Sequence, residues 1–176
     1  MPSAPAGKEA GAGRVLRDRE VEEDMPGCVV IGIGNLLHGD DGFGIHAVRL
    51  LRGKLPEEVE LVEGGVLGLD LLPYLEGKKK AIFIDALDIG EDAGAVYRFS
   101  PDQVKQRPAG PPLSVHDLGL YELVNAAQLL GQCPRSIIFI AVQVKGVELG
   151  GELSEEVRAA LPTVCRMVRE EVQTGR

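Results

Sequence analysis

The fold of this chain is decided by one glycine-rich stretch, which reads Gly32-Ile33-Gly34-Asn35-Leu36-Leu37-His38-Gly39-Asp40-Asp41-Gly42-Phe43-Gly44. The apolar run 28–31 precedes it and is typical of a buried parallel strand, whereas a segment with helical periodicity follows it. The stretch is therefore predicted to be a strand-to-helix loop at the carboxyl end of the first strand. Open α/β sheets bind their ligands at that edge.

Two adjacent carboxylates, Asp40 and Asp41, distinguish this loop from the common nucleotide-binding loops. A Gly-x-Gly-x-x-Gly dinucleotide motif requires a third glycine where Leu37 stands, and a phosphate site is disfavoured because the loop has two acids and no lysine. Neighbouring carboxylates repel each other unless a cation, a shared proton or solvent compensates their charge. A cation-binding loop and an ordinary glycine-rich turn with solvated aspartates are both compatible with this stretch alone.

The composition is that of a protein with one aliphatic core. The chain has 176 residues, of which 44% are hydrophobic and only 4% aromatic, and this predicts a single domain with an aliphatic sheet. The formal net charge of -8 argues against nucleic-acid or anionic-membrane partners, since both need a basic surface. Three distant cysteines, with no signal-peptide pattern and no membrane-spanning apolar stretch, lead us to expect a cytoplasmic protein, and we expect a monomer.

The order of apolar patterns predicts an α/β fold. Residues 1–26 are poor in apolar residues and are predicted to form a flexible tail, which leaves 27–176 as one domain. Alternating strands and helices predict a three-layer α/β/α sandwich with a twisted, mostly parallel five-stranded sheet and one antiparallel edge strand. The predicted strands are 28–31, 59–62, 81–86, 94–99 (the edge strand) and 136–144. The predicted helices are 45–55, 67–75, 114–130 and 154–172, with Ser114 and Ser154 as the caps of the last two. The Pro-rich segment 101–112 and the glycine-rich segment 145–153 are predicted to be loops.

Polar side chains from three distant segments are predicted to meet at the carboxyl edge of this sheet. Asp40 and Asp41 follow the first strand, Asp85 ends the buried strand 81–86, and His116 lies in the first turn of its helix. Oxygen ligands and one imidazole form a typical set for a divalent transition metal, with positions left for substrate or water. His38 could support this site from within the loop, whereas His46 is expected to be a solvated helix residue.

Three segments resemble the signature segments of the [NiFe]-hydrogenase maturation endopeptidases, in the same order and at comparable spacing. They are the stretch 32–44, then Ile84-Asp85-Ala86, then Ser114-Val115-His116-Asp117-Leu118-Gly119-Leu120. The resemblance implies an enzyme that removes a short C-terminal extension from a hydrogenase large-subunit precursor after nickel insertion. It also implies that Asp41, Asp85 and His116 contact the metal, and that this nickel is supplied by the substrate rather than held tightly by the protease.

One loop departs from the family's usual pattern. After the second strand the family commonly has Asp-Gly-Gly-Thr, whereas this chain has Glu63-Gly64-Gly65-Val66. Glu63 could reach a similar position with one more methylene, but Val66 cannot replace a hydroxyl donor. We expect Glu63 and Gly64, together with Gly32, Gly34 and Asn35 of the first loop, to line the substrate site.

The predicted chemistry is hydrolysis of one peptide bond by water. Asp41 and Asp40 are the candidate catalytic carboxylates, and Asp40 is our candidate for the general base. The chain has no serine nucleophile elbow, no His-Glu-x-x-His helix and no cysteine-protease signature. Two alternatives stay open, namely another metal-dependent or acid-type peptidase on the same scaffold, and a noncatalytic assembly factor that binds nickel or the precursor.

Overall fold

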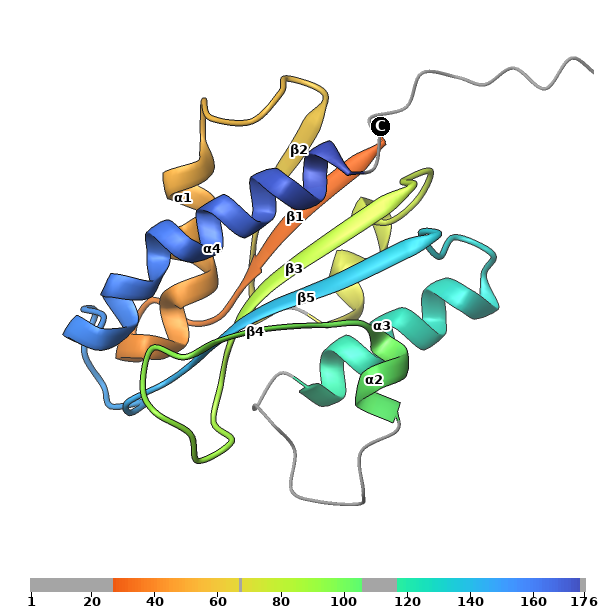
Figure 1. The fold of residues 1–176 in the computed structure, drawn as a ribbon. Coiled ribbons are helices and arrows are strands. Elements are labelled where there is room, and N and C mark those ends of the chain that lie inside the picture. Colours follow the sequence, from red (N-terminus) through yellow and green to blue (C-terminus); the bar gives the residue numbers. More distant parts are fainter. Residues whose placement is uncertain (1–26, 67, 106–116, 175–176) are drawn as a thin grey trace, which may run out of the picture.

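A five-stranded sheet with the order β2-β1-β3-β5-β4 forms the centre of the structure (Figure 1). The structure is a computed structural model, and it describes residues 27–66, 68–105 and 117–174. The strands are β1 (Cys28–Ile33), β2 (Val59–Gly65), β3 (Lys80–Leu87), β4 (Val96–Phe99) and β5 (Ser136–Gln143). β4 pairs antiparallel with β5 at one edge, and the other neighbours pair in parallel. The predicted mostly parallel sheet with an antiparallel edge strand is confirmed.

Helices cover both faces of the sheet, as the predicted three-layer sandwich requires (Figure 1). On one face lie α1 (Phe43–Leu51) and α4 (Glu155–Gln173), and on the other lie α3 (Asp117–Leu129) and the 3-10 helix η2 (Leu69–Tyr74). Two further short elements are the 3-10 helix η1 (Gly39–Gly42) and α2 (Pro101–Lys105).

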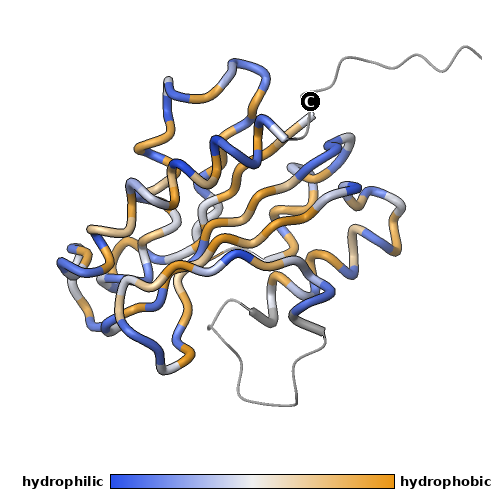
Figure 2. The backbone as a smooth tube through the Cα atoms, viewed as in Figure 1, coloured by the Kyte–Doolittle hydropathy of each residue, from blue (hydrophilic) through white to orange (hydrophobic). Residues whose placement is uncertain are grey.

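Alternate residues of the strands pack into two separate hydrophobic cores, one on each face of the sheet. Val30 and Ile82 pack with α1 and α4, whereas Val29, Ile31 and Phe83 pack with η2 and α3. Because neighbouring side chains of a strand point to opposite faces, the central strands are apolar at nearly every position. Figure 2 accordingly shows mostly hydrophobic colours along the middle of the sheet.

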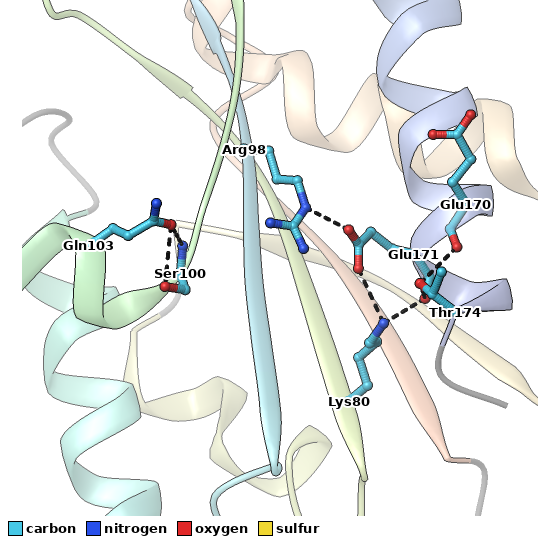
Figure 3. Close-up of polar contacts among 7 residues, drawn as sticks. All are labelled: Lys80, Arg98, Ser100, Gln103, Glu170, Glu171 and Thr174. Atoms are coloured by element: carbon cyan, nitrogen blue, oxygen red, sulfur yellow. Dashed lines mark hydrogen bonds and ion pairs between the residues drawn. The ribbon is translucent and has the colours of Figure 1, made fainter.

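Two predicted segments differ in the structure. The segment 67–75, predicted as a short packed helix, contains a 3-10 helix of six residues that includes Pro73. The segment 101–112 was expected to be a loop, but its first residues form α2. Pro101 suits the first helical position because it has no N–H to leave unpaired, and the Gln103 side chain accepts a hydrogen bond from the Ser100 N–H at 2.8 Å (Figure 3).

Some predictions fall outside the described residues. These are the flexible tail 1–26, the end of the Pro-rich loop, the Ser114 helix cap and the candidate ligand His116. Within the described segments, no helix is both long and apolar enough to cross a membrane.

Candidate functional site

The candidate site lies where β1 and β3 end. Asp41 belongs to η1, directly after β1, and η1 packs against β3. Asp85 is the sixth residue of β3, and its side chain is only 7% exposed. The structure therefore brings these two predicted ligands to the same edge of the sheet.

Glycines allow the helix after the loop to approach the strands closely. A Cβ on Gly44 would overlap the carbonyl oxygens of Ile33 and Ile84, and a Cβ on Gly32 would overlap the Gly44 carbonyl. The start of α1 thus lies against the backbones of both β1 and β3. This contact places η1, and with it Asp41, beside the end of β3.

Asp41 is oriented by the loop that carries it. Its Oδ2 accepts a hydrogen bond from the Asn35 N–H at 2.9 Å, and the Asn35 side chain accepts one from the Leu37 N–H at 3.0 Å. Gly34 has a φ of 130°, a conformation suited to glycine, and a Cβ there would overlap the Asp41 carbonyl. Gly34 and Asn35, predicted to line the substrate site, therefore also set the shape of the loop.

Asp40 differs sharply from its neighbour. It is 2% exposed, and its carboxylate accepts four hydrogen bonds, from the Lys145 N–H (2.9 Å), the Gly146 N–H (3.3 Å), the Ser154 N–H (2.7 Å) and the Ser154 Oγ–H (3.0 Å). Oδ2 accepts three of these hydrogen bonds and Oδ1 accepts the one from the Ser154 N–H, so both oxygens of the buried carboxylate are satisfied. This arrangement favours a positioning role, and the general-base assignment of Asp40 stays a prediction.

Ser154 was not identified as part of this region from the sequence. It precedes α4 at the cap position, as predicted, but its side chain makes no capping hydrogen bond, and its hydroxyl donates to Asp40 instead. The glycine-rich composition of 145–153 indicated a loop. Nothing in that pattern indicated that the loop would bind an aspartate 105 residues earlier in the chain.

Glu63 ends up in an ion-pair cluster. Its carboxylate accepts hydrogen bonds from Arg49 (2.8 Å) and Arg52 (2.5 Å), which extend from α1 and the residue after it. The Arg49 hydrogen bond, with both positive charges, holds the pKa of the Glu63 carboxyl below its usual value. Gly64 beside it is buried, and a Cβ there would lie 2.9 Å from the Ile31 side chain.

The metal-ligand prediction is only partly covered by the described residues. His116 lies outside them, so the structure says nothing about how it lies relative to Asp41 and Asp85. Within 27–66, 68–105 and 117–174, no group of three or more His, Cys, Asp or Glu side chains is placed to hold a metal ion. Asp41 and Asp85 carry carboxylate oxygens, a ligand type that divalent cations bind.

His46 is not the solvated residue expected from the sequence. Its Nε2 is buried and has no hydrogen-bond partner among the described residues, and burial together with Arg49 and Arg158 lowers the pKa of the imidazole. Neutral histidine is therefore favoured at this position.

Comparison with known proteins assigns the chain to a family. A family model described as "Hydrogenase maturation protease" matches residues 45–171. The hydrogenase expression/formation protein HupD of Bradyrhizobium diazoefficiens is 35% identical over 149 residues, covering 81% of this chain and 78% of that protein. This chain belongs to the hydrogenase maturation protease family. It is accordingly an endopeptidase and a hydrolase.

Solved structures of this protease family have the same fold. The hydrogenase maturating endopeptidase HybD from E. coli superimposes with a TM-score of 0.75 at 24% identity, covering 84% of this chain and 93% of that one. The [NiFe] hydrogenase maturation protease HybD from Thermococcus kodakarensis gives a TM-score of 0.72 at 26% identity, covering 82% of this chain and 98% of that one. The α/β architecture predicted from the sequence is therefore also that of the family.

Proposed function

We propose that this maturation protease removes a C-terminal extension from a nickel-loaded [NiFe]-hydrogenase large-subunit precursor. The observation that carries the proposal is the placement of Asp41 and Asp85 at one edge of the sheet in a chain of this family. The relatives named hydrogenase maturation proteases support the choice of substrate class.

Nickel enters this reaction as part of the substrate. In the proposal the precursor holds the ion, and Asp41, Asp85 and His116 complete its coordination when the precursor binds. An empty precursor lacks this contact, so the protease discriminates between the loaded and the empty forms through differential affinity. Recognition of the ion also holds one peptide bond of the precursor next to the carboxylates.

The described residues supply a fixed frame for this recognition. The Asn35 N–H orients the Asp41 carboxylate, and the Asp85 Oδ1 accepts the Ala86 N–H at 2.8 Å. Pre-oriented ligands lose little freedom on binding, which favours a specific contact with the ion. Asp40 holds the neighbouring loop in place, and it stays our candidate for the general base that activates the water.

The test is incubation of the protein with a purified large-subunit precursor, with and without nickel, followed by gel analysis of its length. We expect shortening only of the loaded precursor. His116→Ala, Asp41→Asn and Asp85→Asn should each abolish it, because each removes one contact with the ion. Asp102→Asn, an exposed acid in α2, is the matched control and should cleave normally. Full processing by the His116 variant, or equal processing of the empty precursor, would exclude the proposal.

A further inference from the structure

Large apolar side chains are exposed in the three loops that follow β1, β2 and β5. They are Leu37 (69% exposed), Val66 (59%), Val147 (54%) and Leu149 (85%), and we call these four residues the apolar rim. The three strands are parallel or linked through parallel neighbours, so their following loops lie at the edge that carries Asp41 and Asp85. Exposed apolar clusters of this kind mark interaction sites in soluble proteins.

Main-chain hydrogen bonds connect these loops. The Gly150 N–H donates to the Leu37 carbonyl at 2.9 Å, and the Gly39 N–H donates in return to the Gly150 carbonyl. On the other side, the Gly34 N–H donates to the Gly65 carbonyl at 2.8 Å, next to Val66. The rim residues therefore extend from loops that are joined to the segment carrying Asp41.

Asp40 fixes the base of the loop that carries Val147 and Leu149. Its carboxylate binds the N–H groups of Lys145 and Gly146 at the start of this loop and both donors of Ser154 at its end. Both ends of this loop are thus hydrogen-bonded to the same buried carboxylate. Side chains on such a held loop pay less ordering entropy when a partner covers them.

We propose that the apolar rim docks an apolar surface of the large-subunit precursor beside the candidate catalytic carboxylates. The inference rests on the proposed function, which supplies the partner. The substrate is the molecule that must contact this edge in each turnover, because Asp41 lies in one of the loops that form the rim. A second copy of the chain bound there would cover the same edge and hinder cleavage.

The test measures processing and binding of the nickel-loaded precursor by Leu37→Ser and Leu149→Ser. Removing a leucine that becomes buried on docking should raise KM by about tenfold for each variant. The kcat should change little, since neither side chain belongs to the proposed metal site. Leu129→Ser is the matched control, because Leu129 is 88% exposed and ends α3, away from the three rim loops.

Each outcome decides the inference separately from the proposed function. If the wild-type protein does not cut the loaded precursor, the proposed function fails. If it does cut, and both rim variants keep the wild-type KM and affinity, the docking role alone is excluded. A change in the oligomeric state of the free variants with unchanged KM would instead assign the rim to self-association. Leu149 is exposed enough that its variant should keep the wild-type melting temperature, so it carries the test if Leu37→Ser is unstable.

Discussion

At the scale of single residues, Asp40 and Asp41 show that identical neighbours can have different tasks. Asp40 is buried under four hydrogen bonds, whereas Asp41 faces the loop and accepts the Asn35 N–H. Burial of a carboxylate is tolerated only when its oxygens are satisfied, and here main-chain donors do this. The sequence shows only the pair of acids, because the donors come from a loop more than 100 residues away.

Asp40→Asn should lower the free energy of unfolding by about 3 kcal/mol. The new amide N–H group would face the N–H and O–H donors that the carboxylate accepts, and the hydrogen bonds that remain would lose their charged acceptor. Chemical unfolding measures this loss. Ser154→Ala keeps the carboxylate and the main-chain donors, so it should cost only about 1 kcal/mol. A stable Asp40→Asn protein that binds the loaded precursor normally but cannot cut it would contradict the positioning role and favour the general base.

At the scale of elements, the strands are the part of the fold that the sequence predicts best. The apolar runs at 81–86 and 136–144 gave β3 and β5 to within two residues, because strands buried on both faces carry no polar alternation. The 3-10 helix η2 and the short helix α2 were harder to predict. Both contain proline and are too short for a helical period to be visible.

The contact between α1 and the sheet depends on one glycine. Gly44→Ala would place a methyl group against the backbone oxygens of Ile33 and Ile84, which cannot move as a flexible side chain can. We expect a loss of about 3 kcal/mol in the free energy of unfolding, at the upper end of the range for overpacked positions. Gly146→Ala is the matched control, because a Cβ there meets no atom of the described segments within 4 Å. Equal unfolding midpoints for the two variants would show that α1 does not need this close approach.

At the scale of the whole molecule, Asp85 of the candidate site and the Lys80–Glu171 ion pair lie at opposite ends of β3. Asp85 is near the end of β3, whereas Lys80 is its first residue and pairs with Glu171 of α4. The sequence could predict the end of β3 that carries Asp85, because an aspartate at the end of an apolar strand stands out. It could not predict the ion pairs of Glu171 with Lys80 and Arg98. In the sequence these three residues look like ordinary charged surface residues, and only the fold brings them together (Figure 3).

This separation predicts that stability and substrate recognition can be changed independently. Burial alone would raise the pKa of the Glu171 carboxyl, but hydrogen bonds from Arg98 (2.5 Å) and Lys80 (3.2 Å) outweigh it and hold that pKa below its usual value. The stabilisation is therefore present above the pKa of the unfolded carboxyl and is lost as the pH falls through the lower, folded-state pKa. Glu171→Gln should cost about 2 kcal/mol at pH 7, flatten this acid dependence in chemical unfolding and leave the KM for the precursor unchanged. Glu170→Gln, whose exposed pair with Arg166 spans 3.9 Å, should change neither quantity, and equal effects of the two substitutions would contradict the role of the network.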